Sequence, residues 1–135
     1  MLRASVAADG AVVAQIGPGL LVLLGVSRDD TETDALRLAQ RVAALRVFAD
    51  SSGPINAPLG DREVLCVSQF TLYGDTRRGN RPSYSQAASG QQAQPLYDAF
   101  CAALGAKQGV FGAQMTVELV NDGPVTLMLE QPRPS

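Results

Sequence analysis

The stretch Glu63-Val64-Leu65-Cys66-Val67-Ser68-Gln69-Phe70-Thr71-Leu72 decides how this chain folds. Because it is largely apolar and ends in small polar residues, we predict a central β-strand over Glu63 to Leu72. Side chains alternate along a strand, so Ser68 and Phe70 are expected on one face and Gln69 and Thr71 on the other. Two interpretations of these polar residues stay open at this point: a functional edge, or a strand that simply runs out into solvent.

The segments before this stretch predict further strands. Ala4 to Ala8 and Ala11 to Ile16 flank Asp9-Gly10, which is a strong signal for a tight hairpin. Gly17-Pro18-Gly19 interrupts the pattern, and the continuous apolar character of Leu20 to Val26 is typical of a strand buried on both faces. The chain is therefore expected to begin as a sheet.

Two amphipathic helices are predicted from apolar residues that recur at spacings of three and four. Asp29, Asp30 and Thr31 are capping candidates for the first helix. The second helix contains Pro95, which is tolerated if it falls in the first turn. The apolar stripes are Ala35, Leu38, Val42 and Leu45 in the first helix, and Leu96, Phe100, Ala103 and Leu104 in the second.

The remaining segments complete an α+β prediction. A short strand is expected at Arg46 to Phe48, a loop at Asp50 to Asp61, and strands at Met115 to Val120 and Val125 to Glu130. Tyr73 to Gly90 is too long for a structureless connection unless it is functional, so we expect a binding loop. With many short strands, a closed, barrel-like and mainly antiparallel sheet with two helices packed outside it would hide the strand edges.

Composition limits the class of protein. A chain of 135 residues fits a single domain over 1–135, and 46% apolar with 18% charged residues is ordinary for a globular protein. The longest apolar run, Leu20 to Leu24, is too short to cross a membrane, and no secretory signal is visible, so we expect a cytoplasmic protein without a membrane partner. A net charge of −2 argues against binding long nucleic acid, and hence DNA, by bulk electrostatics.

The chain contains no histidine, and this excludes catalytic triads, Cys-His pairs and histidine metal sites. Cys66 and Cys101 are expected as buried, reduced thiols, because neither has the spacing of a zinc site. No metal and no cofactor is therefore predicted. A nucleophilic hydroxyl at Ser68 or Thr71 would need a base, and the single lysine, Lys107, is not placed to serve as one.

Two further features suggest a binding surface. Arg77, Arg78 and Arg81 cluster in the polar loop, and arginine forks suit phosphate groups. If each meets one phosphate, affinity falls with salt with a log–log slope of about −2 to −3. Gly123-Pro124 joins a turn to an apolar segment, where glycine allows close approach and proline fixes the backbone, in either a cis or a trans peptide.

Three motifs together resemble the D-aminoacyl-tRNA deacylase family. They are the stretches at 67–72, at 73–79 with Arg81-Pro82-Ser83, and at 120–126. The likeness extends from about Arg3 to Leu129. The family pattern has an initial strand that ends in a Gln-Arg pair before Arg3, and this sequence does not show it. The stretch from Asn56 to Asp61 is shorter than the pattern, and Val110 stands where the pattern has arginine.

The resemblance implies a homodimeric hydrolase with a barrel-like α+β fold, which cleaves the ester between a D-amino acid and the 3′-terminal adenosine of tRNA and also acts on glycyl-tRNA. It implies that Gly123-Pro124 is a cis-proline element that enters the partner subunit's pocket and excludes L-amino acids. Main-chain groups of Phe70 and Thr71 would stabilise the reacting carbonyl. The implied pocket residues are Ser68, Gln69, Phe70, Thr71, Phe111 and Gly112.

An activated ester with a neighbouring ribose hydroxyl needs mainly orientation and oxyanion donors, so the absence of histidine fits this reaction. Two other function classes are weighed beside it. One is a non-catalytic dimeric tRNA-binding domain of the same fold that binds the acceptor end without turnover. The other, with less support, is a regulatory domain for a small ligand, which would show no salt-dependent affinity for tRNA.

Overall fold

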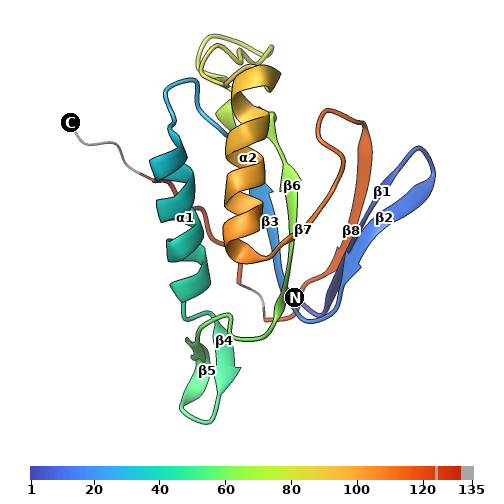
Figure 1. The fold of residues 1–135 in the computed structure, drawn as a ribbon, viewed down its shortest axis with the longest axis vertical. Coiled ribbons are helices and arrows are strands. Elements are labelled where there is room, and N and C mark those ends of the chain that lie inside the picture. The colour runs from blue at the N-terminus through green and yellow to red at the C-terminus, as the bar shows by residue number, and fades with distance from the viewer. Residues whose placement is uncertain (124, 132–135) are drawn as a thin grey trace.

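The computed structural model describes residues 1–123 and 125–131, and Figure 1 shows its layered arrangement. A hairpin and a carboxyl-terminal strand form one layer, a second sheet lies in the middle, and the helices cover the outer face of that sheet. The described elements are β1 (Arg3–Ala8), β2 (Ala11–Ile16), β3 (Gly19–Leu24), α1 (Glu32–Ala44), β4 (Phe48–Asp50), β5 (Gly53–Ala57), β6 (Glu63–Ser68), the 3₁₀ helix η1 (Phe70–Tyr73), α2 (Gly90–Leu104), β7 (Lys107–Gln108) and β8 (Met115–Val120).

The first layer is an antiparallel sheet in the order β2-β1-β8. The predicted hairpin is confirmed, because β1 and β2 pair antiparallel around Asp9 and Gly10, whose φ angles are 52° and 79°. Both residues adopt the left-handed region that such a turn requires. Val6 in the centre of β1 lies opposite Ala14 of β2 and Val117 of β8, and it is fully buried.

The middle layer is a parallel sheet in the order β3-β6-β7. The other strand pairs are antiparallel, as predicted, but the prediction of one closed sheet is wrong. Leu20 of β3 lies opposite Val64 of β6, and Leu24 lies opposite Ser68. The connection between β3 and β6 runs through α1, and a crossover of this kind returns the chain in the same direction. Among the described residues the two layers are separate sheets, and the barrel does not close.

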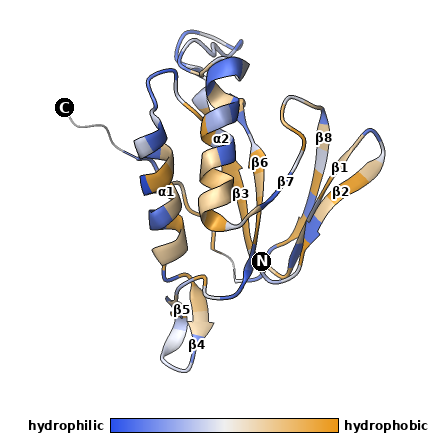
Figure 2. Cartoon of the chain, viewed as in Figure 1, coloured by the Kyte–Doolittle hydropathy of each residue, from blue (hydrophilic) through white to orange (hydrophobic). Residues whose placement is uncertain are grey.

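Strand β6 is buried on both faces, as its apolar sequence suggests. Leu65 and Val67 point towards the first layer and pack with Val6, whereas Cys66 points towards the helices and packs with Phe100. Figure 2 shows the same arrangement, with apolar residues concentrated on β3 and β6 in the middle of the molecule. The prediction of a central strand is thus confirmed for Glu63–Ser68.

The central strand ends earlier than predicted. After Ser68 the N–H of Gln69 donates to the carbonyl of Leu24 over 2.7 Å, and β3 ends at Leu24, so no neighbouring strand continues the ladder. The chain turns instead into η1, where the N–H of Leu72 donates to Gln69. The predicted alternation of side chains beyond Ser68 is therefore wrong.

Other predicted boundaries also change. The stretch Asp50 to Asp61, predicted as a loop, contains β5, which pairs with β4 in a hairpin below α1 in Figure 1. Pro95 lies inside α2 and not in its first turn; the carbonyl that it leaves unpaired belongs to the exposed Gln91, where water can satisfy it. Residues 125–130, predicted as a strand, form none in the described structure.

Capping residues define the ends of the two α-helices. Thr31 caps α1 in a capping box with Asp34, which confirms one of the predicted capping residues. Ser89 caps α2 through the N–H of Gln92, and Gly105 ends α2 in the left-handed conformation with φ 64°. None of the described helices is long and apolar enough to span a membrane.

The two cysteines are free and buried, as predicted. A hydrogen bond with Cys101 and burial raise the pKa of the Cys66 thiol, so Cys66 stays protonated. Beside them the hydroxyl of Tyr97 donates to the carbonyl of Cys66 over 2.8 Å and thereby ties α2 to β6. Burial raises the pKa of Tyr97 as well.

We expect Tyr97→Phe to lower the free energy of unfolding by about 1 to 2 kcal/mol, because a buried hydrogen bond between α2 and β6 is lost. Urea titration followed by circular dichroism measures this change. Tyr84→Phe is the matched control, because the Tyr84 hydroxyl makes no hydrogen bond within the described residues, and its stability should stay within about 0.5 kcal/mol of wild type. Equal stabilities for Tyr97→Phe and wild type would contradict the role of this bond.

Candidate functional site

The candidate site lies where β6 ends and η1 begins. Ser68 is the last residue of the strand, and Gln69 continues the ladder by one hydrogen bond to Leu24. Phe70 and Thr71 then emerge at the surface, and the side chain of Phe70 is 56% exposed. The polar residues singled out in the sequence are thus brought together by the turn that follows the strand.

The backbone of Phe70 and Thr71 presents unused donors. Their N–H groups donate none of the hydrogen bonds found in the described part of the chain, whereas the N–H groups of Gln69, Leu72 and Gly74 are all paired. The first N–H groups of a helical turn have no partner within that turn. Two adjacent free N–H groups can stabilise a carbonyl oxygen that develops negative charge.

The hydroxyl of Thr71 does not have the surroundings of a nucleophile. It accepts a hydrogen bond from the side-chain amide of Gln69, and no histidine exists in the chain. The Nζ of Lys107 lies 3.2 Å from Glu63 and 3.0 Å from the carbonyl of Gln15, at the opposite end of β6. No base in the described structure therefore activates Thr71.

The arginines of the following loop differ in their surroundings. Arg77 forms a bidentate ion pair with Asp75, with 2.8 Å between Nη2 and Oδ2. Its hydrogen bonds lower the pKa of Asp75 to about 2, so this carboxylate stays charged at neutral pH and largely neutralises Arg77. Arg78 and Arg81 are exposed and make no ion pair within the described residues.

Two contacts of the loop were not predicted from the sequence. Tyr84 packs against Phe70 edge to face, with 5.1 Å between the ring centroids, and Asp75 pairs with Arg77. The signal for Tyr84 is an aromatic residue in a polar loop, which needs an apolar neighbour for its ring. Only the folded chain shows that this neighbour is Phe70.

Phe111 and Gly112, predicted to line the pocket, lie in the loop before β8. The ring of Phe111 packs against Tyr97 of α2 with 5.8 Å between centroids, and it belongs to the edge of the core beneath the helices. Gly112 is exposed and has a φ of 79°. Neither residue makes a described hydrogen bond or ring contact with Ser68 to Thr71.

Gly123 lies in an exposed turn with a φ of 148°, which glycine adopts far more readily than other residues. Pro124 lies outside the described residues, and with it the predicted cis peptide. Asn121 and Val125 line the same cavity as Leu72 of η1, but at its other end. Val120 accepts a hydrogen bond from Leu2, next to the start of β3, whereas η1 follows the end of β6, so within one chain Gly123 lies at the opposite end of the parallel sheet from Ser68.

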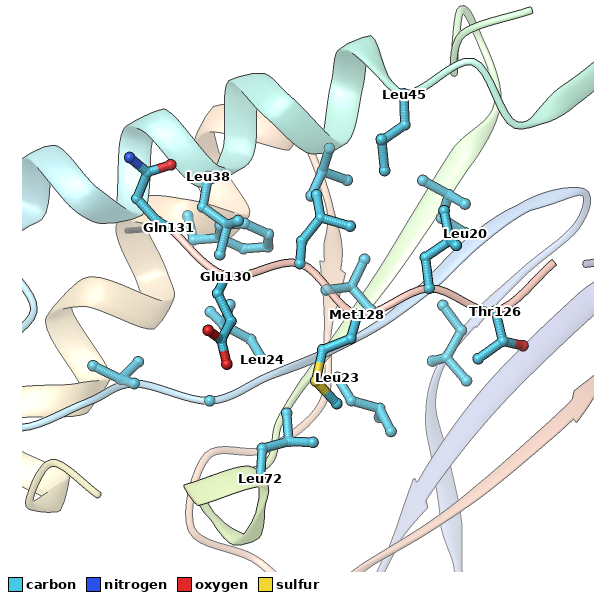
Figure 3. A pocket seen from close by; sticks show the side chains of 18 of the residues that line it. Leu20, Leu23, Leu24, Leu38, Leu45, Leu72, Thr126, Met128, Glu130 and Gln131 are labelled. Carbon is cyan, nitrogen blue, oxygen red and sulfur yellow. The ribbon is translucent and has the colours of Figure 1, made fainter. Parts of the chain in front are cut away.

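This cavity has a volume of about 590 Å³ and is largely apolar. It lies between β3, α1 and residues 125–131, with Leu20, Leu38 and Leu45 in its walls (Figure 3). The side chain of Met128 extends towards Leu23, and Leu72 lies close below. Arg41 of α1 donates to the carbonyl of Glu130 and so anchors the far end of the segment.

A group of three or more metal-binding side chains is absent from residues 1–123 and 125–131. The site therefore consists of backbone donors, an aromatic pair and two exposed arginines. Such a set can orient and polarise a carbonyl compound that carries phosphates.

Comparisons with known proteins agree with this chemistry. The family model described as D-Tyr-tRNA(Tyr) deacylase matches residues 1–130. A protein of Anaeromyxobacter dehalogenans, named D-aminoacyl-tRNA deacylase, is 53% identical over 138 residues, which cover 97% of this chain and 93% of that protein. A protein of Deinococcus radiodurans with the same name is 52% identical and covers 95% and 93%.

Solved structures show the same fold. A structure titled "c-Myc DNA Unwinding Element Binding Protein" has a TM-score of 0.89 and 39% identity, and the match covers 98% of this chain and 95% of that one. A structure titled as a probable eukaryotic D-amino acid tRNA deacylase has a TM-score of 0.73 and 16% identity over 87% and 88%. The α+β class is confirmed, and so is the resemblance noted in the sequence: the chain belongs to the D-Tyr-tRNA(Tyr) deacylase family.

Proposed function

We propose that this protein hydrolyses the ester bond of D-aminoacyl-tRNA and releases free tRNA and the D-amino acid. The observation that carries the proposal is the pair of free N–H groups at Phe70 and Thr71, in a chain whose relatives are named D-aminoacyl-tRNA deacylases. An ester that is already activated needs donors for its carbonyl oxygen more than it needs a strong base. The site has such donors and lacks a histidine.

In the proposed reaction, water attacks the ester carbonyl carbon, and the N–H groups of Phe70 and Thr71 stabilise the oxyanion that forms. The bond to the ribose 3′ oxygen then breaks, and this oxygen takes up the proton lost by the water. The neighbouring 2′ hydroxyl of the ribose relays that proton, which replaces the missing general base. Thr71 acts through its backbone, since its hydroxyl has no base beside it.

Selection against L-amino acids belongs to Gly123 and Pro124 in this proposal. A rigid backbone wall rejects a side chain of the wrong hand by a clash, and a thousandfold preference requires about 4 kcal/mol. The hydrogen atom of glycine avoids the clash, so glycyl-tRNA is a second substrate. A cis Gly123-Pro124 peptide that enters the pocket of a second subunit is part of the proposal.

Exposed apolar side chains support a homodimer. Leu23, Leu72, Leu127 and Met128 are all more than two-fifths exposed, and Met128 reaches 79%. Leu23, Leu72 and Met128 lie near one another around the mouth of the cavity in Figure 3. A patch of this kind beside the site is typical of a surface that a partner covers. We propose a second copy of the chain as that partner, because its Gly123-Pro124 is what completes the pocket.

Arg78 and Arg81 are the proposed phosphate contacts for the acceptor end of tRNA. They are the two arginines of the loop after η1 that have no carboxylate partner within the described residues. Two such contacts suit a short terminal segment of nucleic acid.

Purified protein should hydrolyse D-tyrosyl-tRNA at least a thousandfold faster than L-tyrosyl-tRNA, measured by release of labelled tyrosine. Thr71→Ala should keep kcat within about threefold of wild type, because only the backbone of Thr71 takes part. Substrate with a 2′-deoxy terminal ribose should react at least a hundredfold more slowly. Binding of tRNA without hydrolysis would support the non-catalytic alternative, and loss of activity in a folded Thr71→Ala protein would revive the hydroxyl nucleophile.

The salt dependence of tRNA binding tests the arginine assignment. Replacing Arg78 and Arg81 together by alanine should weaken binding and reduce the log–log salt slope by about 1.5 to 2, because roughly one released counterion is lost with each arginine. Arg77→Ala should change the slope by less than about 0.5, because Asp75 already neutralises that charge. Arg37→Ala on the outer surface of α1 is the control. If Arg77→Ala reduced the salt slope as much as the double replacement of Arg78 and Arg81, the assignment of the phosphate contacts to Arg78 and Arg81 would be contradicted.

Met128→Asp should convert a dimer to a monomer, because it places a charge at the centre of the apolar patch. Light scattering coupled to gel filtration measures the mass. Ile55→Asp is the matched control, since Ile55 is 63% exposed but lies on β5, outside the patch. A wild-type protein that is monomeric at all concentrations would overturn the proposal.

A further inference from the structure

We infer that Tyr84 is a positioning residue, whose ring holds the Phe70–Thr71 backbone in the orientation that ester hydrolysis needs. The inference rests on the proposed function, because it concerns the donors of the same site. It adds a residue from the following loop, which acts through the packing of its ring.

The ring of Tyr84 contacts η1 from two directions. It packs against Phe70 with 5.1 Å between centroids and an angle of 70° between the rings. It also lies close to the backbone of Gly74, where an added Cβ would be 3.1 Å from a Tyr84 ring carbon and 3.0 Å from the carbonyl oxygen of Thr71. The ring thus occupies the space beside both ends of η1.

The backbone around Tyr84 is anchored. Just before it, Ser83 pairs with Asp75 through two hydrogen bonds of 2.7 and 2.9 Å. Just after it, the N–H of Ala87 donates to the carbonyl of Tyr84 over 3.1 Å, and Ala88 donates to Val26 over 2.9 Å. A fixed backbone on both sides allows the ring to act as a rigid support.

The backbone of Phe70 and Thr71 lies beyond the end of strand pairing, and the side chain of Phe70 is not buried. Strand pairing stops at Leu24 and Ser68, and beyond that point hydrogen bonds from Leu72 to Gln69 and from Gly74 to Thr71 connect η1 to the residues beside it. Phe70 is more than half exposed, so burial does not hold its side chain. A catalytic donor that moves by about 1 Å can cost roughly a hundredfold in rate, and the contact with Tyr84 opposes such a movement.

The position of Tyr84 also connects the two parts of the site. The Asp75–Ser83 pairing closes the loop that holds Arg78 and Arg81, and Tyr84 follows that closure directly. The ring of Tyr84 therefore connects the loop of Arg78 and Arg81, the proposed phosphate contacts, with the backbone donors of Phe70 and Thr71.

Steady-state kinetics with D-tyrosyl-tRNA test this inference. Tyr84→Ala should lower kcat by about 10- to 100-fold and leave KM within about threefold, because orientation and not binding is lost. Tyr84→Phe keeps the ring and should retain at least half of the wild-type kcat. Gly74→Ala crowds the same contact from the other side and should lower kcat in the same way. Leu36→Ala is the control, because Leu36 has the same 40% exposure as Tyr84 but lies on α1.

Hydrogen–deuterium exchange provides a measurement that does not depend on activity. Exchange at the amides of Leu72 and Gly74 should be faster in Tyr84→Ala than in wild type and in Tyr84→Phe. Unchanged exchange, a change in KM alone, or an equal loss of kcat in Tyr84→Phe would overturn the inference. If wild-type protein does not hydrolyse D-tyrosyl-tRNA, the proposed function fails, and exchange by itself then decides whether Tyr84 supports η1.

Discussion

The parallel pairing of β6 with β3 is the interaction on which the rest of the structure depends. It places β6 between two apolar layers, with Leu65 and Val67 packed on one side and Cys66 on the other. The pairing of β6 with β3 ends at a defined point, because β3 stops at Leu24 and the N–H of Gln69 donates the last hydrogen bond of the ladder to Leu24. The chain must turn there, and the turn leaves the N–H groups of Phe70 and Thr71 without partners. The position at which this strand ends is thus fixed by the core, and it exposes the two backbone donors of the candidate site.

A site of this kind suits a chain without histidine. Backbone N–H groups keep their polarity at every pH and need no proton transfer to become active. The charged residues of the nearby loop have different surroundings. Asp75 forms an ion pair with Arg77, whereas Arg78 and Arg81 are exposed and form no ion pair within the described residues. The proposed reaction depends mainly on orientation, and the contact between Phe70 and Tyr84 is where we propose that this orientation is held.

The local elements were largely predictable. The hairpin at Asp9-Gly10, the cap at Thr31 and the strand Met115–Val120 follow from patterns within a few residues, and the structure confirms them. The predictions failed where distant pairing decides the result. The end of β6 depends on the length of β3, and residues 125–130 form no strand in the described structure despite an apolar sequence. The closed sheet failed for a related reason, because among the described residues no strand of the β2-β1-β8 sheet pairs with a strand of the β3-β6-β7 sheet.

The sequence by itself determined the class of the fold, the absence of histidine chemistry and the family, because composition and short motifs carry that information directly. Only the tertiary structure decided which of the motif residues lie together. It turns Phe111 towards the core against Tyr97 and brings Tyr84 against Phe70 across thirteen intervening residues. The physical reason is that these contacts join residues on different elements, and their partners are set by how the layers pack and where strand pairing ends.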